Sequence, residues 1–207
     1  MRHLFRHAAS PEAAEPITGP ETASGPITYT MDPGHTEVIA TWNHFGFSTP
    51  SAMFCRIAGT LVHDANRPEE SAVEVTIPVE GLHTTVPLQD EHLKGAEFFD
   101  AATFPDIRFK STQVKRGAAP DKLEVTGDLT VHGVTKSITL AVTVNKLGFH
   151  EMYKAQAAGF DATAKLNRSD FGVGAHVPMV GDRIDLKITA EAVESKAWEV
   201  IRKNHSE

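Results

Sequence analysis

The feature that most constrains this chain is an alternation of apolar and polar residues, repeated many times between Ile27 and Val193. In residues 184–190, Ile, Leu, Ile and Ala alternate with Asp, Lys and Thr. Successive side chains of a β-strand point to opposite faces, so each such segment has one apolar face and one solvated face, as in antiparallel sheets. The same period recurs in segments 37–44, 73–77, 107–110, 123–132, 138–144 and 160–166. With residues 53–63, the pattern predicts about eight strands.

Two segments depart from this period. Residues 89–95 interrupt the strands and predict a short helix, with Leu93, Phe98 and Phe99 available to cover it. In the second segment, near the C-terminus, Trp198 and Ile201 are spaced three apart, as on one face of a helix. Residues 194–207 therefore predict a C-terminal helical tail that packs either on the domain or on a partner chain.

Eight strands with one apolar face require either two packed sheets or closure into a barrel. Several apolar faces carry small residues at positions 40, 127, 162, 164 and 190. The core of a sandwich interdigitates at close packing, whereas small inward residues leave room for a ligand. The sequence favours a barrel and leaves a sandwich as the alternative.

Composition and charge exclude several classes of protein. Acidic residues outnumber basic ones 27 to 20, giving a net charge of −7, which argues against a nucleic-acid partner. A single cysteine, Cys55, excludes an intrachain disulfide. The sequence contains no run of eighteen apolar residues, so it predicts no transmembrane helix. The first 26 residues lack the apolar stretch of a signal peptide and are expected to form a flexible segment before a domain at 27–193. We therefore expect a cytoplasmic protein, with the periplasm as the alternative.

Motifs for catalysis or metal binding are missing from the sequence. Residues 46–50, the nearest match to a nucleophile elbow, lack its second glycine, and residues 172–174 lack the third glycine of a dinucleotide loop. There is no HExxH motif, and the histidines are scattered along the chain. The sequence therefore predicts no catalytic residue, no metal site and no required cofactor, but a container for a ligand.

Several strings, taken in order, resemble the YceI family of lipocalin-like polyisoprenoid-binding proteins, and together they cover roughly residues 27–193. They are YTMDPGHT (29–36), HFGFS (44–48), HLKGAEFFD (92–100), FPDIRFKS (104–111), GDLTVHGVTK (127–136), NRSDFG (167–172) and VGD (180–182). The resemblance implies an all-β, eight-stranded antiparallel lipocalin-like barrel with a long apolar pocket. It also implies an amphipathic isoprenoid lipid as ligand, such as a polyprenyl phosphate or a respiratory quinone.

The candidate ligand-binding residues fall into three sets. The apolar strand faces are expected to form the pocket wall, and they supply Val38, Ala40, Trp42, Val75, Ile77, Phe109, Leu129, Leu140, Val142, Phe160, Ala162, Leu186 and Ile188. Phe98 and Phe99 are expected at a lid or mouth, or else in a minor core. His44, Arg168 and Asp170 are candidates for the head group, because an arginine can pair with a phosphate or polarise a quinone carbonyl.

Each polar candidate has a structural alternative. Arg168 and Asp170 would instead fix their own turn, and His44 would be a satisfied core residue. At the level of function, non-catalytic binding, storage or transport of the lipid competes with two other hypotheses. One is an enzyme acting on the bound lipid through His44, Arg168 and Asp170. The other is a structural stress-response module with a filled barrel. The resemblance also predicts a homodimer, for which Trp198 and Ile201 would supply a seam.

Overall fold

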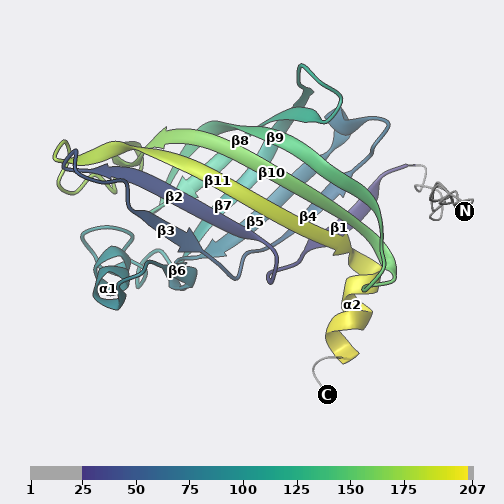
Figure 1. The fold of residues 1–207 in the computed structure, drawn as a ribbon, viewed down its shortest axis with the longest axis horizontal. Coiled ribbons are helices and arrows are strands. Elements are labelled where there is room, and N and C mark those ends of the chain that lie inside the picture. Colours follow the sequence, from purple (N-terminus) through teal and green to yellow (C-terminus); the bar gives the residue numbers. More distant parts are fainter. Residues whose placement is uncertain (1–24, 205–207) are drawn as a thin grey trace, which may run out of the picture.

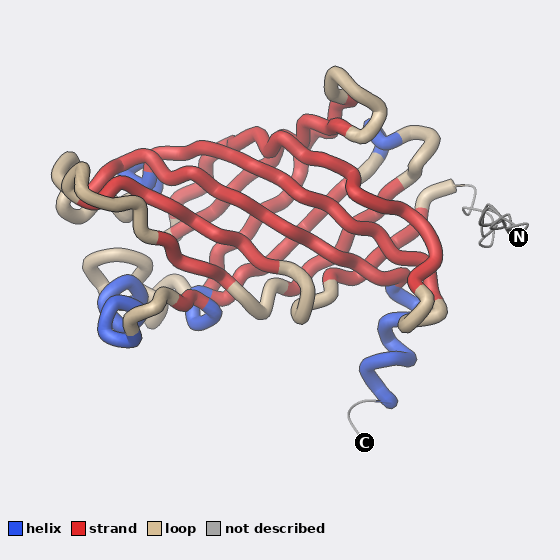
Figure 2. Tube along the Cα trace, in the orientation of Figure 1, coloured by secondary structure: helices blue, strands red, loops and turns tan. Residues whose placement is uncertain are grey.

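The computed structural model describes residues 25–204 of the chain, and its main feature is one antiparallel sheet wrapped into a barrel (Figures 1 and 2). The strands are β1 (Ile27–Met31), β2 (Glu37–His44), β3 (Ser51–Phe54), β4 (Ala58–His63), β5 (Ala72–Pro78), β6 (Leu82–His83), β7 (Asp106–Arg116), β8 (Lys122–Val131), β9 (Val134–His150), β10 (Ala155–Asn167) and β11 (Val180–Glu194). The helices are α1 (Pro87–Lys94) and α2 (Ser195–Asn204), and short 3₁₀ turns lie at Pro68–Glu70, Val79–Gly81 and Arg168–Phe171.

Eight of these strands close the ring. The order is β1-β4-β5-β7-β8-β9-β10-β11, and β11 pairs back onto β1. This confirms the predicted eight-stranded antiparallel barrel, and closure leaves these strands no free edge along the ring. The predicted flexible segment lies almost entirely in residues 1–24, outside the described residues, as do residues 205–207 of the tail.

The strand β11 has two partners in succession along the same edge. Its end at Ala192–Glu194 pairs with β1, and its middle, from Ile184 to Thr189, pairs with β2. The chain continues the sheet from β2 through β3 to β6, and β6 has no further strand partner among the described residues. At that end of the barrel the wall is therefore completed by α1 and its flanking turns rather than by a strand (Figure 1).

The register of β8 against β9 shows why the alternation of apolar and polar residues predicts which side chains face the barrel interior. Leu123 of β8 pairs with Val142 of β9, and Val125 pairs with Leu140, so buried residues face one another on the inside. The intervening Glu124 pairs with Ala141, and both side chains are exposed on the outside. Because side chains alternate along both strands, a single register places the large apolar residues Leu123, Val125, Leu140 and Val142 together in the interior.

Gly127 creates less space than the sequence suggests. A Cβ at this position would lie 2.5 Å from the Phe109 ring and 2.5 Å from the Lys110 carbonyl oxygen, so the ring already covers the glycine. Ala40, Ala162 and Ala190, by contrast, line the interior cavities described below. The small residues of the inner face therefore serve two different purposes, close ring packing at Gly127 and open space at Ala40, Ala162 and Ala190, whereas the buried Ala164 lines neither cavity.

Several strands are longer than the predicted segments, as β9 (Val134–His150) is for 138–144, and β1 and β6 correspond to no predicted segment. Two further differences have a clear cause. The stretch 53–63 is two strands rather than one, because Arg56 takes a positive φ of 60° and Ile57 turns inward to become fully buried. The helix α1 begins at Pro87 rather than Gln89, since proline is well suited to the first turn of a helix. Gly95 ends it by donating its N–H to the carbonyls of Glu91 and His92.

The C-terminal helix packs on its own barrel. Trp198 and Ile201 contact a cluster formed by Ala155, Ala157 and Val193, and the Trp198 ring meets Tyr153 edge-on. The side chains expected to pair two copies are thus used within the chain, and the homodimer stays a prediction. No helix in residues 25–204 has the length and apolar character needed to cross a membrane.

Candidate functional site

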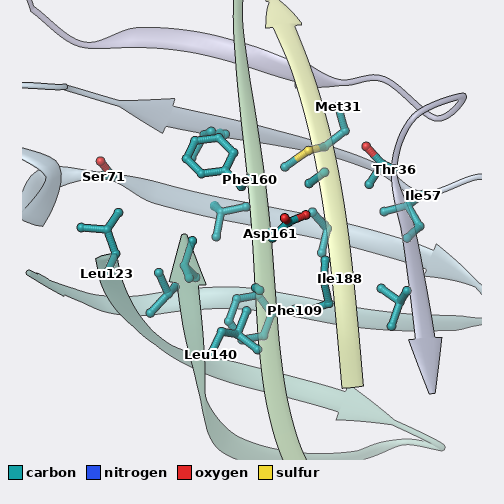
Figure 3. Close-up of a pocket in the computed structure, with 18 of the residues that line it drawn as sticks. Met31, Thr36, Ile57, Ser71, Phe109, Leu123, Leu140, Phe160, Asp161 and Ile188 are labelled. Atoms are coloured by element: carbon teal, nitrogen blue, oxygen red, sulfur yellow. The ribbon is translucent and has the colours of Figure 1, made fainter. Parts of the chain in front are cut away.

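The interior of the barrel holds two apolar cavities that meet end to end. The first, called here the inner chamber, has a volume of about 170 Å³ and is walled by the strands of the closed ring together with β2 (Figure 3). Its labelled side chains, including Phe109, Leu140 and Ile188, come from different strands and gather around one space. The second, called the outer chamber, has a volume of about 260 Å³ and lies towards α1.

The junction between the chambers is wholly apolar. Four residues, Val38, Ile77, Leu129 and Leu186, line both chambers. Along β11 the combined lining runs from Val180 to Ala190, on the order of 30 Å of strand at about 3.3 Å per residue. The two chambers therefore form a long, narrow hydrophobic space rather than a compact pocket.

The structure places nearly all of the predicted ligand-binding residues in this lining. In the inner chamber these are Val38, Val75, Ile77, Phe109, Leu129, Leu140, Val142, Phe160, Ala162, Leu186 and Ile188. In the outer chamber they are Val38, Ala40, Trp42, His44, Ile77, Phe98, Phe99, Leu129, Arg168 and Leu186. The exception is Asp170, which is exposed and lines neither chamber.

Polar groups occur at the far end of the inner chamber. The His63 ring is buried, its Nδ1 lies 2.8 Å from the Ser71 hydroxyl, and it meets the Phe160 ring edge-on. Burial lowers the pKa of His63 below its usual 6.5, against the opposing effect of the neighbouring Asp64 carboxylate. A lowered pKa favours the neutral imidazole at this position, and Asp161 is the one ionisable acid in the lining of the chamber.

A hydrogen-bonded cluster lies behind the wall where β1 turns into β2. The buried Asp32 carboxylate accepts hydrogen bonds from His35 Nδ1 at 2.8 Å, from the Tyr153 hydroxyl at 2.7 Å and from the Gly34 N–H at 2.8 Å. Burial opposes ionisation, yet these three bonds together hold the pKa of Asp32 below its ordinary value. Burial, followed by the hydrogen bond to Asp32, raises the pKa of Tyr153 to about 12.

This cluster contains the one group of three potential metal ligands found among residues 25–204. It comprises Asp32, His35 and Glu191, whose ligand atoms lie within 4.8 Å of one another. The Asp32 oxygens are already engaged by the three donors above, so the geometry is that of a cross-linked turn. The turn fixes Met31 and Thr36, which flank it and line the inner chamber.

The outer chamber has a polar rim made of imidazoles and an amide. His44, Gln89, His92 and His176 all line it. Glu97 joins two of them, since its carboxylate accepts a hydrogen bond from His92 Nε2 at 2.9 Å and lies 3.2 Å from His176 Nε2. The hydrogen bond from His92 holds the pKa of Glu97 below its ordinary value.

Arg168 is the most deeply placed charge of the outer chamber. Its guanidinium donates to three backbone carbonyls, those of Val173 at 2.6 Å, Val180 at 2.9 Å and Gly181 at 2.9 Å. Burial lowers the pKa of Arg168, and the nearby Asp182 opposes that shift. The arginine therefore fixes the loop that leads into β11.

The partner that holds this turn is Asp182 rather than Asp170. Its carboxylate accepts hydrogen bonds from the Ser169 N–H at 2.9 Å and from the Ser169 hydroxyl at 2.7 Å. With Arg168 occupied by carbonyls and Asp170 outside the chambers, the structure does not assemble the catalytic group hypothesised from His44, Arg168 and Asp170.

Several lining residues were not predicted from the sequence. Ile57, Phe54, Phe171 and His176 lie in short links, turns or a strand too short to show alternation, and the return of the chain places them at the interior. A partial signal existed in the string Phe171-Gly172, because a glycine with a positive φ of 77° ends the 3₁₀ turn and directs the preceding Phe171 inward.

A closed antiparallel barrel around a continuous apolar space defines the lipocalin-like class of β-barrel proteins. Within that class, the chain belongs to the YceI-like domain family, whose model matches residues 29–192.

Individual relatives agree with this assignment. A "UPF0312 protein" of Pseudomonas syringae pv. tomato is 37% identical over 154 residues, which cover 74% of this chain and 79% of the relative. The crystal structure of a Campylobacter jejuni YCEI protein is 27% identical with a TM-score of 0.66, covering 74% of this chain and 90% of that one. A polyisoprenoid binding domain from Saccharophagus degradans shares the fold at 10% identity, with a TM-score of 0.60 and coverage of 81% and 99%.

Proposed function

We propose that the protein binds an amphipathic isoprenoid lipid, a polyprenyl phosphate or an isoprenoid quinone, and stores or carries it without changing it chemically. The observation that carries this proposal is the pair of joined apolar chambers, which form one narrow space along the barrel. A narrow, branched-residue-lined space suits a flexible hydrocarbon tail better than a compact polar metabolite. The Saccharophagus degradans domain of the same fold supports the class of ligand.

The energetics require a long tail. Each buried methylene-sized group contributes about 0.8 kcal/mol, so twenty groups contribute roughly 16 kcal/mol. Association costs about 4–15 kcal/mol in lost translational and rotational freedom. Ten groups contribute only about 8 kcal/mol, which lies within that range. A tail that extends through both chambers therefore gives stable binding, and one confined to a single chamber gives weak binding.

The distribution of polar groups suggests an orientation. The junction at Val38, Ile77 and Leu186 has no polar side chain, whereas the outer rim offers imidazole and amide groups. We place the head group at the outer rim, with the tail running through the outer chamber and its far end in the inner chamber. There His44, Gln89 and His176 are the residues available to it, while Arg168 is occupied by backbone carbonyls.

Native mass spectrometry of the purified protein tests this proposal. We expect either a co-purified adduct of lipid mass or uptake of an added long-tailed isoprenoid quinone or polyprenyl phosphate. An unbranched fatty acid serves as the comparison, and we expect weaker uptake of it. Absence of any adduct together with no uptake of either isoprenoid would overturn the proposal.

A further inference from the structure

Three large apolar side chains project into solvent at the outer end of the barrel. Phe47 is 91% exposed, Phe45 49% and Met179 57%. They come from two separate segments, the turn between β2 and β3 and the loop before β11 (left-hand side of Figure 1). The Phe45 N–H donates to the Met179 carbonyl at 3.1 Å, so the two segments lie side by side. Exposed apolar groups gathered in this way mark an interaction surface.

The same two segments carry no formal charge. Residues 38–55 and 171–181 contain no Asp, Glu, Lys or Arg, although these types make up 23% of the chain. Moving the tips of these segments out of water involves no desolvation of ionised side chains, provided that Asp170 and Asp182, which border the loop, stay in water. The opposite end of the barrel differs, because loops 64–71 and 115–122 each hold four charged residues and are joined by an ion pair between Arg116 and Glu69.

The backbone of the projecting turn is largely satisfied within the chain. The His44 N–H donates to the Ser48 carbonyl at 2.9 Å, the Phe47 N–H to the His44 carbonyl at 3.0 Å, and the Gly46 N–H to Asn43 Oδ1 at 2.8 Å. Positive φ angles at Phe45 and Gly46 make the turn tight. A turn whose N–H groups are already paired can enter an apolar phase at little cost.

The projecting turns surround the opening of the outer chamber. His44 and His176 line that chamber and are also exposed, so the chamber reaches the surface between the two segments. Across the opening, α1 supplies Gln89 and His92 to the lining and exposes Leu88 to solvent. A lipid entering or leaving the outer chamber at this opening passes these apolar tips.

We propose that this end of the barrel docks on a lipid bilayer, inserting Phe45, Phe47 and Met179 so that the outer chamber opens towards the membrane. The inference rests on the proposed function, because a lipid ligand is what connects the chamber to a bilayer. Convex, uncharged tips with a paired backbone fit the interfacial region of a membrane. The apolar chamber that opens between these tips favours a bilayer over a protein as the partner, and the net charge of −7 gives no general attraction to anionic lipids.

Vesicle flotation of the full chain with uncharged phosphatidylcholine vesicles tests the docking. The wild-type protein should float with the vesicles, with little change when salt is raised, because insertion is apolar rather than electrostatic. Replacing both rings in Phe45→Ser/Phe47→Ser should lower the vesicle partition coefficient by at least about tenfold, given the transfer free energy of a phenylalanine side chain. The matched control is Met152→Ser, which removes an apolar side chain of 84% exposure at the opposite end and should leave binding unchanged.

Four outcomes would overturn the proposal. These are no flotation of the wild-type protein, equal flotation of the double variant, flotation that needs anionic lipid and vanishes with salt, and gel filtration showing that the two rings instead join a second copy. Native mass spectra of the same samples separate this inference from the proposed function. Lipid in the chambers without vesicle binding overturns the docking alone, whereas vesicle binding without uptake of either isoprenoid overturns the proposed function and leaves a membrane-docking barrel.

Discussion

The inner and outer chambers differ in the elements that build their walls. Strand residues make up almost all of the inner chamber, and its polar lining residues are Thr36, His63, Ser71 and Asp161. The outer chamber combines strands with α1, with Phe98 and Phe99, and with the turn and loop from 168 to 180. A wall of regularly spaced apolar strand residues suits a tail built of repeated isoprenoid units. The irregular segments of the outer chamber instead place individual polar side chains at its opening. The comparison assigns the far part of the tail to the inner chamber, and the near part of the tail, access and head-group selection to the outer chamber.

Filling the inner chamber with a larger side chain should have the largest effect on the affinity for the lipid. Ala162 lines only that chamber, so Ala162→Trp would displace several carbons of the tail. Displacing about five groups at roughly 0.8 kcal/mol each would weaken binding by about 4 kcal/mol, on the order of a thousandfold. The affinity of a long-tailed quinone, measured by fluorescence titration or native mass spectrometry, reports this loss. A short-tailed quinone should lose much less, because it fits the outer chamber.

The matched control is Thr163→Trp on the same strand, whose side chain is exposed on the outside of the barrel. It should bind both quinones as the wild-type protein does. Equal losses for the long and the short tail in Ala162→Trp would contradict the division of roles between the chambers. Thermal melting of both variants excludes unfolding as the cause.

Removing the arginine of the outer chamber should reduce stability before it reduces binding. Arg168→Met leaves buried carbonyls of Val173, Val180 and Gly181 without their donor, at about 1–3 kcal/mol for each group that water does not reach. We expect the free energy of unfolding to fall by roughly 3 kcal/mol or more. Denaturant titration measures this, with Arg183→Met as the control, because that exposed arginine pairs only with Asp185 and contributes about 0–1 kcal/mol.

The same variant also tests the head-group hypothesis. If Arg168→Met kept its stability and lost affinity for a polyprenyl phosphate but not for a quinone, the arginine would be a phosphate ligand. That result would move head-group recognition deeper into the outer chamber than the rim described here.

A smaller effect on stability is expected from His63, whose imidazole lines the inner chamber. Because the folded pKa of His63 lies below 6.5, the unfolded state binds more protons as the pH falls through that value. The folded state therefore loses stability on acidification below about pH 6.5, and His63→Gln should remove this part of the loss. Denaturant titrations at about pH 7 and pH 5 compare the two proteins. Identical pH slopes would show that His63 does not titrate from a buried, neutral state.

The smallest effect on stability is expected at His35, which lies behind the barrel wall. Its pH dependence is opposite in sign to that of His63. Its hydrogen bond with Asp32, followed by the charge of that carboxylate, raises the pKa of His35 above 6.5. The stabilisation is complete below about pH 6.5 and is lost as the pH rises through the folded pKa. His35→Gln should therefore destabilise the protein more at about pH 6 than at about pH 8.5. A constant difference in melting temperature between wild type and variant across this range would contradict the assignment.

The sequence predicted the inner chamber better than the outer one for a physical reason. Period-two alternation determines the side on which a strand residue lies, so Leu140 and Ile188 could be placed inside without knowing the register. Closure of the ring then brought these faces together. The family resemblance added the expectation of a barrel and a lipid, which composition alone could not distinguish from a sandwich.

The outer chamber depends on loop geometry that has no local pattern. Arg168 acts on carbonyls that a loop of some ten residues returns to it, and Asp182 takes the position expected for Asp170. His176 reaches the rim only because its loop folds back beside the turn at Phe45. Such contacts follow from tertiary structure, so the sequence indicated that the NRSDFG string matters without indicating what each side chain contacts.

The free outer edge of β6 makes one section of the wall mechanically different from the rest. Elsewhere around the ring, separating neighbouring strands breaks ladder hydrogen bonds, but β6 has no further strand partner among residues 25–204. The backbone there is joined by isolated hydrogen bonds, from Cys55 N–H to the Gly81 carbonyl at 3.0 Å and from Val79 N–H to the Pro105 carbonyl at 2.8 Å. Backbone amides near the seam should exchange with deuterium faster than those of β8 to β10. The barrel can thus loosen beside the unpaired edge of β6 and α1 while the hydrogen bonds between its paired strands stay intact.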